Sequence, residues 1–254
     1  MWAHESIDEN TYIVDGDTND IEVRVLSTTE KQNLTSPPVS VRDVLVVASL
    51  LARVPRMPID AISNVLWFAG VLVTVVAETT ESVYGDSEMN HDYLHLKIPR
   101  FDLPLGVRIL QFFDVVAECT SHDQGWASEG TQHNGTYNGS WTWADIVVVK
   151  DHGEDGEEEA NRFTLCHNLR ARRVFRHHVK RFDSGSQLTS SIVPGDTLKL
   201  VLRSRFPGWA NTASFGRLQV RVVLDIDEDF DFSSSKELNE IVSMLENQRA
   251  CCIQ

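Results

Sequence analysis

Residues 173–205, RVFRHHVKRFDSGSQLTSSIVPGDTLKLVLRSR, decide the fold, because they hold two short strand-like segments with turn residues and no helical pattern between them. Arg173–Phe182 and Thr197–Arg205 are the two segments, and the turn sequence VPGD leads into the second. Similar segments recur from residue 93 onward: Tyr93–Ile98, Arg108–Cys119, Trp141–Lys150, Arg162–Leu165 and Arg217–Leu224. Many short strands with turns and no interleaved helices predict a mainly β protein, with an antiparallel, jelly-roll-like β-sandwich over residues 90–226.

Two apolar stretches, residues 41–54 and 58–77, precede the predicted sandwich. Pro58, with Asp60 in the first turn, marks a helix start. Residues 39–85 are therefore predicted to be an N-terminal helical segment in which two helices pack together.

A membrane helix is the alternative for the second stretch, since Ala61–Ala77 nearly reaches the length of a bilayer span. Asp60, Ser63 and Asn64 and the lack of basic flanks favour the packed pair. The β-branched residues within Val71–Val76 leave helix or strand open at that point.

The two ends of the chain are polar. Residues 1–38 are acidic, end in Ser-Pro-Pro and are expected to be mostly disordered. Residues 227–254 continue an acidic linker into a short C-terminal helix, in which apolar residues recur at helical spacing. The chain ends in Cys-Cys-Ile-Gln, which fits the C-a-a-X motif and predicts farnesylation of Cys251, with a chance tetrapeptide as the alternative.

The composition narrows the class of protein. A net charge of −14 argues against nucleic-acid binding, since attraction to phosphates drives most such binding. The first residues, MWAHESIDEN, lack the basic and apolar regions of a secretory signal, so a cytoplasmic protein is expected. Cys119 and Cys166 are then best explained as reduced, buried thiols. Nucleotide, nucleophile-elbow and zinc motifs are missing from the sequence, so no cofactor or metal is expected.

An aromatic tract, SHDQGWASEGTQHNGTYNGSWTW at Ser121–Trp143, holds three of the six tryptophans. Ring faces beside amide and carboxylate groups suit a site that stacks and hydrogen-bonds a polar ligand. The candidate ligand-binding residues are His122, Asp123, Gln124, Trp126 and Tyr137. Two alternatives remain. Trp141 and Trp143 could pack into the core as residues i and i+2 of one strand, and Asp123 and Gln124 could bond loop backbone.

A second candidate wall is RSRFPGWAN at Arg203–Asn211, where a Pro-Gly turn presents Trp209 between Arg205 and Asn211. These three residues are predicted to line the same pocket as the aromatic tract. The alternative is a buttressed turn in which Arg205 stacks on Trp209.

A basic run follows the aromatic tract, and it includes Arg170, Arg172, Arg173 and Arg176. It predicts a patch for an anion or an acidic partner. The alternative is a solvated strand face paired with the acidic loop 154–159.

Several of these motifs together resemble an uncharacterised group of fungal proteins with an F-box-like helical N-terminus and a β-sandwich. The matching residues are P-x-D-x(4)-V-L-x-F-A at Pro58–Ala69, SHDQGW at 121–126, GTY and SWTW within 135–143, and RFPGWAN at 205–211. The resemblance covers roughly residues 40–225, and the chain departs from it after Ala69, where GVLVTVV follows. It implies a sandwich similar to galactose-binding-like jelly rolls.

The sequence thus predicts a noncatalytic intracellular binding protein whose sandwich recognises a glycan-like or other polar ligand, or a protein partner. One alternative is a membrane-associated adaptor, farnesylated at Cys251 and linked to ubiquitin ligases through a Skp1-type adaptor. Another is an enzyme that uses His122 and Asp123, which would require both side chains to converge in a deep pocket.

Overall fold

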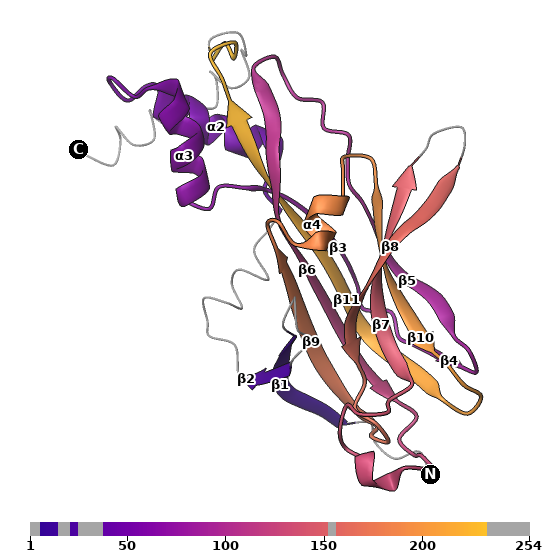
Figure 1. Ribbon diagram of the computed structural model, residues 1–254. Coiled ribbons are helices and arrows are strands. Elements are labelled where there is room, and N and C mark those ends of the chain that lie inside the picture. Colours follow the sequence, from indigo (N-terminus) through magenta and orange to yellow (C-terminus); the bar gives the residue numbers. More distant parts are fainter. Residues whose placement is uncertain (1–5, 15–20, 25–37, 152–155, 233–254) are drawn as a thin grey trace. The chain divides into compact units, whose positions relative to one another are not determined.

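A computed structural model of the chain describes residues 6–14, 21–24, 38–151 and 156–232. Two β-sheets pack as a sandwich (Figure 1), so the predicted fold class is confirmed. The eight strands of the sandwich are β4 (Val83–Asp86), β5 (Asn90–Lys97), β6 (Val107–Asp123), β7 (Thr142–Asp151), β8 (Glu157–His167), β9 (Val174–Asp183), β10 (Thr197–Ser204) and β11 (Ala210–Ile226). A single turn of 3-10 helix, η1 (Thr131–His133), lies between β6 and β7, and a short helix, α4 (Gln187–Ser191), lies between β9 and β10.

The pairing of these eight strands is that of a jelly roll. Strand β4 pairs with β11, β5 with β10, β6 with β9 and β7 with β8, all antiparallel, so the first half of the chain folds back along the second. One sheet has the order β5-β10-β7-β8. The other contains β9-β6-β11, with β4 and β3 (Val73–Thr79) on β11, and β1 (Ser6–Val14) and β2 (Ile21–Arg24) beyond β9. This nested pairing wraps one long hairpin into two sheets.

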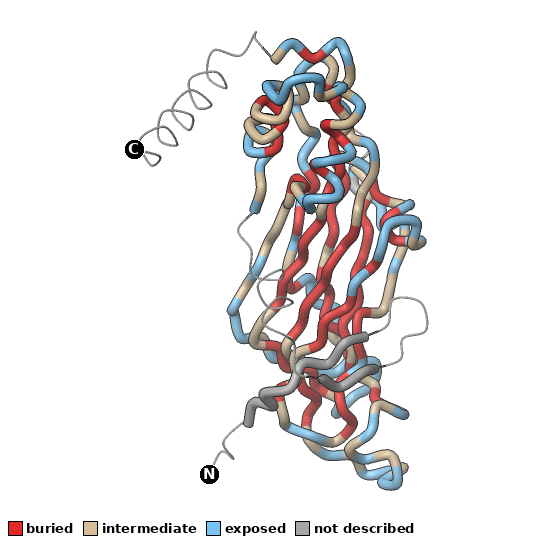
Figure 2. The backbone as a smooth tube through the Cα atoms, turned by 90° about the vertical axis from the view of Figure 1, so that its left-hand side faces the viewer, coloured by how far each residue is buried: buried red, intermediate tan, exposed pale blue. Residues whose placement is uncertain are grey.

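Alternating side chains build the core between the sheets. In β10, Leu198, Leu200 and Leu202 are fully buried, and they pair with Val148, Ile146 and Ala144 of β7. Figure 2 shows buried residues running along the long strands in the middle of the molecule. The residues between them on β7, such as Trp143 and Asp145, therefore face the outer side of the four-stranded sheet.

The described chain forms two compact units. The sandwich unit comprises Val76–Arg100 and Asp114–Val220 together with β1 and β2, and it holds every candidate ligand-binding residue. The helical unit comprises residues 38–75, 101–113 and 221–232.

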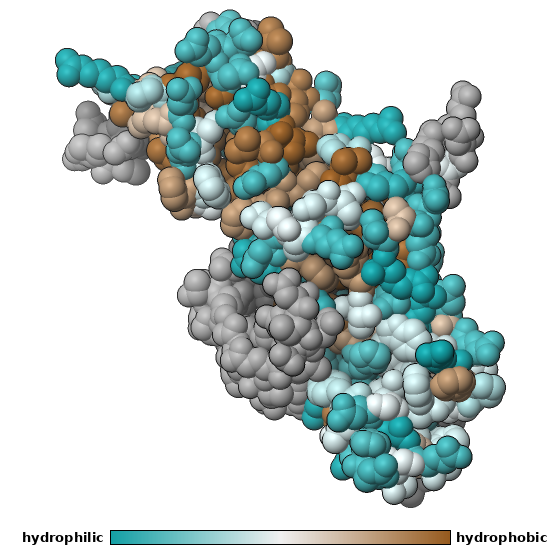
Figure 3. Space-filling view, in the orientation of Figure 1, coloured by the Kyte–Doolittle hydropathy of each residue, from teal (hydrophilic) through white to brown (hydrophobic). Residues whose placement is uncertain are grey.

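In the helical unit, two short helices pack against each other, α2 (Val41–Ala52) and α3 (Ile59–Phe68). Ser40 caps α2 through a capping box with Asp43, and α3 begins directly after Pro58. The hydroxyl of Ser63 on α3 accepts a hydrogen bond from the Ile226 amide at 3.0 Å. Hydrophobic side chains gather on the surface of this unit (Figure 3).

The alternative of one long membrane helix over Ala61–Ala77 is wrong, and the region left open at Val71–Val76 is mostly strand. Helix α3 ends at Phe68, the chain turns at Gly70, which has a φ of 68°, and β3 begins at Val73. The β-branched run after Gly70 favours a strand, because its χ1 angles are restricted in a helix. No helix in the described part of the chain is long and apolar enough to cross a membrane.

Other boundaries also differ from the expectation. Residues 6–14 and 21–24 form β1 and β2 within the segment that was expected to be mostly disordered, and β3 and β4 lie within the segment expected to be helical. Cys119 and Cys166 are buried free thiols, as predicted. The predicted C-terminal helix and Cys251 lie outside the described residues, so farnesylation stays a prediction.

Candidate functional site

The two tryptophan-containing tracts meet at one end of the sandwich unit. Gln124, just after β6, joins them, since its Oε1 accepts a hydrogen bond from the Ala210 amide at 3.1 Å and its Nε2 donates to the Trp126 carbonyl at 2.7 Å. Beside this link lies a pocket of about 490 Å³, the end pocket. Its lining includes Gln124, Trp126, Trp141, Arg170, Phe206 and Trp209.

Aromatic rings form much of the open wall of the end pocket. Trp126 is 57% exposed and Phe206 is 41% exposed, while Trp141 and Trp209 are half-buried. The rings of Trp141 and Phe206 meet edge to face with centroids 5.0 Å apart. Exposed rings that gather beside polar groups are typical of a ligand-binding surface.

A tight turn holds the second wall of this pocket. The Trp209 amide donates to the Phe206 carbonyl at 3.1 Å across Pro207-Gly208, and Gly208 has a φ of 82°. Proline followed by a glycine at positive φ is the pattern of a type II turn. A β-carbon added at Gly208 would lie 3.7 Å from Cη2 of Trp126, so the two tracts face each other closely.

Asp123 is fully buried and is bonded to backbone. Its carboxylate accepts hydrogen bonds from the amides of Gly125 at 2.8 Å, Ala171 at 2.7 Å and Arg172 at 3.0 Å. Burial raises the pKa of the Asp123 carboxyl, and these three amides oppose that rise. The residue therefore fixes the loop after β8 against the end of β6.

Asn211 and His122 are also buried and bonded within the protein. The Asn211 amide donates to the carbonyls of Trp143 at 2.9 Å and Arg203 at 3.0 Å, and its oxygen accepts from Asn168 at 2.8 Å. The His122 ring packs edge-on against Phe175 and lies 2.6 Å from the Asp123 carbonyl. His122, Asp123 and Asn211 do not line either pocket described here.

Arg170 of the predicted anion patch is buried and ties the pocket loop together. Its guanidinium donates to the carbonyls of Gly139 at 2.6 Å and Glu129, and to the Asn134 side chain at 3.3 Å. It also lies over the Trp209 ring, 5.3 Å from the centroid. The sequence had offered Arg205 as the partner of Trp209; the structure places Arg170 there instead.

The other predicted residues lie on different surfaces. Tyr137 packs against β9, where its hydroxyl lies 3.2 Å from His178 Nε2 and accepts from Arg176 at 3.1 Å. Arg173 donates to the Gln124 carbonyl at 2.7 Å, and Arg172 is exposed. The four arginines therefore do not form one patch. Arg170 is buried in the pocket loop, Arg172 and Arg173 are exposed, and Arg176 contacts Tyr137.

A second pocket of about 360 Å³ lies on the outer face of the four-stranded sheet, and we call it the sheet-face pocket. It is lined by Trp141, Trp143, Asp145, Arg162, Thr164, His167 and Arg205. Trp141 lines both pockets, so the two hollows adjoin. The alternative that Trp141 and Trp143 pack into the core is wrong, because both are only half-buried and face away from Ala144 and Ile146.

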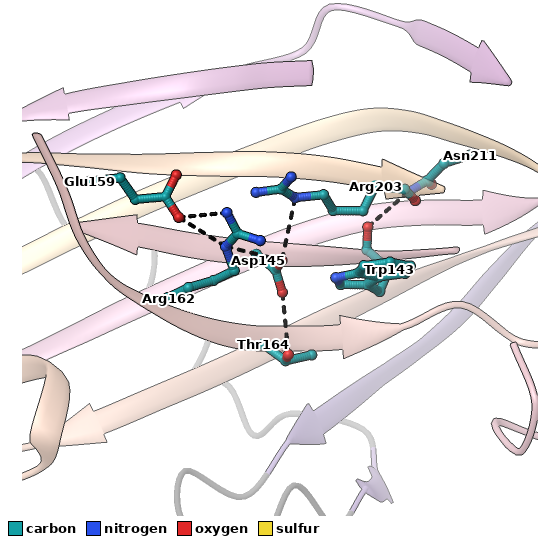
Figure 4. Close-up of polar contacts among 7 residues, drawn as sticks. All are labelled: Trp143, Asp145, Glu159, Arg162, Thr164, Arg203 and Asn211. Atoms are coloured by element: carbon teal, nitrogen blue, oxygen red, sulfur yellow. Dashed lines mark hydrogen bonds and ion pairs between the residues drawn. The ribbon is translucent and has the colours of Figure 1, made fainter. Parts of the chain in front are cut away.

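Asp145 forms the buried floor of the sheet-face pocket (Figure 4). Its carboxylate accepts a hydrogen bond from Thr164 at 3.2 Å and lies 3.4 Å from Arg203 Nε and 4.0 Å from Arg162 Nε. Burial raises the pKa of Asp145, opposed by the Trp143 indole and these cations. Burial also lowers the pKa of His167, which favours the neutral ring at pH 7.

Sequence reasoning did not single out Asp145, Arg162, Thr164 or His167. The available signal was the spacing of Trp141, Trp143 and Asp145, which places all three on one face of a strand. The partners on β8 come from strand pairing, in which Trp143 faces His167 and Asp145 faces Thr164. Single-residue spacing does not reveal that register.

Comparisons with known proteins do not assign the chain to a family. No protein-family model and no curated protein matches the sequence. The chain is similar to an Eiger TNF structure from S. frugiperda at 9% identity and a TM-score of 0.32, over 62% of this chain and 98% of that chain. It is also similar to a CBM4 structure at 9% identity and a TM-score of 0.26, over 61% of this chain and 94% of that chain. At these values neither likeness bears on function, and the resemblance to the fungal group stays a prediction.

Proposed function

We propose that the protein is a noncatalytic binding protein whose end pocket takes a glycan-like ligand. The observation that carries this proposal is the exposed ring of Trp126, set opposite the Pro-Gly turn and Trp209 across a hollow of about 490 Å³. That volume falls within the roughly 300–1,000 Å³ of small-molecule sites.

The mixture of groups suits a hydroxyl-rich ring. A sugar has an apolar C–H face and a rim of hydroxyls, so its binding site needs an aromatic surface beside hydrogen-bonding groups. Trp126 and Phe206 supply exposed aromatic surface. The side chain of Glu129 is exposed at the same hollow, where it offers an acceptor for hydroxyls.

The pocket is also held in place before any ligand arrives. Gln124 joins its two walls, Asp123 fixes the adjoining loop, and Arg170 ties the carbonyls of Glu129 and Gly139. A preorganised site loses less conformational entropy on binding. The side chains of His122 and Asp123 diverge, one toward Phe175 and the other toward backbone amides, so the proposal gives them no catalytic part.

A glycan array probed with the full chain tests this function. We expect wild-type protein to bind a subset of neutral or acidic oligosaccharides, and Trp126→Ala to reduce those signals at least about ten-fold, as is typical for an aromatic anchor. Trp67→Ala is the matched control, since Trp67 is 40% exposed but belongs to the helical unit. Equal signals from wild type and Trp126→Ala contradict the site, and no signal on any glycan contradicts the function.

A further inference from the structure

The Arg205 side chain stands out on the boundary between the two pockets. Its guanidinium carbon lies 5.4 Å from the centroid of Trp141 and 5.5 Å from that of Phe206. Among the described residues, no carboxylate or carbonyl accepts a hydrogen bond from this guanidinium, and no acid lies within ion-pair distance of it. These cation–π contacts use none of the guanidinium N–H groups as hydrogen-bond donors, so the donors stay available to a ligand.

The other charges of the sheet-face pocket already have partners. The Asp145 carboxylate lies 3.4 Å from Arg203, and Arg162 makes a 2.5 Å contact with Glu159 (Figure 4). His167 is favoured as a neutral ring because burial lowers its pKa. The charge of Arg205 is therefore the uncompensated one among the described lining residues, in a protein whose net charge is −14.

From this geometry we propose that the sheet-face pocket is a second subsite for the same ligand, and that Arg205 there binds a carboxylate. The proposal rests on the glycan-like ligand proposed for the end pocket and adds its class: an acidic oligosaccharide long enough to cross Trp141. The planar guanidinium presents paired N–H groups, which match the two oxygens of a carboxylate.

The physical setting strengthens such a contact. Trp141 and Phe206 fix the orientation of the guanidinium, so less side-chain freedom is lost when the anion binds. Trp141 and Trp143 line the same pocket and offer ring surface for the sugar that carries the acid. The buried pair of Asp145 and Arg203 supports that surface from below.

The test uses matched pairs of oligosaccharides on an array. Uronate oligomers from pectin, alginate and hyaluronan are printed beside the same oligomers after reduction of their carboxyl groups to neutral alcohols. Wild-type full chain is expected to prefer at least one uronate oligomer over its reduced partner by about ten-fold, the usual scale of a charge-assisted hydrogen bond. Arg205→Gln is expected to remove that preference, and raising the salt from about 50 to 500 mM to weaken it.

Matched variants keep the result interpretable. Arg100→Gln is the control, since Arg100 is an exposed arginine of the sandwich unit that lines neither pocket. Arg205 is exposed, so Arg205→Gln is expected to fold, and its melting curve is measured alongside. Trp143→Ala is expected to weaken long oligomers more than short ones.

The possible outcomes separate the two proposals. Equal binding of uronate and reduced oligomers, or an unchanged preference in Arg205→Gln, overturns the acidic subsite and leaves the end pocket standing. If the protein binds only neutral glycans, and Trp126→Ala abolishes that binding, the acidic subsite is also overturned and the end pocket stands. Binding to no oligosaccharide at all overturns both.

Discussion

The two sequence tracts that meet at the end pocket each contain residues of two kinds. Asp123 and Asn211 are fully buried, and hydrogen bonds to nearby protein groups are shown for each of their side chains. Trp126 and Arg205 come from the same tracts, yet both are exposed. The first pair forms the framework of the site and the second pair forms its open surface.

This difference follows from side-chain size and position. Short carboxylate and amide groups near strand ends can reach the amides and carbonyls that the sheet leaves unpaired there. A tryptophan on a loop is too large to be buried by that loop alone. Residues that look equally polar and functional in the sequence are therefore separated by whether backbone groups lie within reach.

The largest effect is expected from Asp123→Ala. Three part-buried backbone amides lose an acceptor that is itself fully buried, so the free energy of unfolding should fall by about 4 kcal/mol. Urea denaturation measures this change. Asp86→Ala is the control, since Asp86 is an exposed acid of β4, and a loss as small as the control's would remove Asp123 from the framework.

Asn211→Ala is expected to cost about 3 kcal/mol of unfolding free energy, because two strand carbonyls and the Asn168 amide lose their partner. Asn138→Ala, at an exposed loop position, should stay within about 0.5 kcal/mol of wild type. If both variants unfold at the same urea concentration, Asn211 does not serve the framework.

His178, which contacts Tyr137, gives a pH-dependent test of the buried side. Burial lowers its pKa to about 3, below the ordinary 6.5, so the unfolded chain binds the extra proton between these values. Stability from this group is nearly complete at pH 7.5 and declines as pH falls, by about 1.6 kcal/mol between pH 6.5 and 5. Unfolding free energies of wild type and His178→Gln, measured at both pH values, should converge toward pH 5. A constant difference would rule out this linkage.

The smallest effect on stability is expected from Trp126→Ala, at about 0.5 kcal/mol or less, because more than half of this residue's surface is exposed. Glycan binding by the same variant should nevertheless fall about ten-fold or more. Chemical denaturation of the variant distinguishes the two kinds of residue. If Trp126→Ala lowers the free energy of unfolding as much as Asn211→Ala does, Trp126 belongs to the framework of the site and not to its open surface.

Much of the sandwich could be predicted from the sequence. The seven segments expected from residue 93 onward all fall on β5 to β11, because their alternating or continuous apolar residues and turn sequences are local signals. Strands β3 and β4 were not predicted. Strand β3 follows closely on the apolar helix α3, and β4 has only four residues. Their assignment depends on pairing with β11, which is far away in the chain.

The candidate site was predictable only in part. The sequence predicted that Trp126 and Trp209 line one pocket, because both lie in turn-rich stretches between strands, and both line the end pocket. It could not show that β6 continues to Asp123 or that β11 begins at Ala210, and these boundaries decide which polar residues are buried. The sheet-face pocket depends on the register of β7 and β8, which local patterns do not fix.

The most direct test of the central claim is to follow the six tryptophan indole N–H signals by NMR. The full chain is titrated with the oligosaccharide that gives the strongest array signal, and signals are assigned by single Trp→Phe variants. We predict large shifts for Trp126, Trp209 and Trp141, with Trp67 of the helical unit unchanged. Saturable shifts at Trp67, with Trp126 and Trp209 unmoved, would contradict the claim that the end pocket is the binding site.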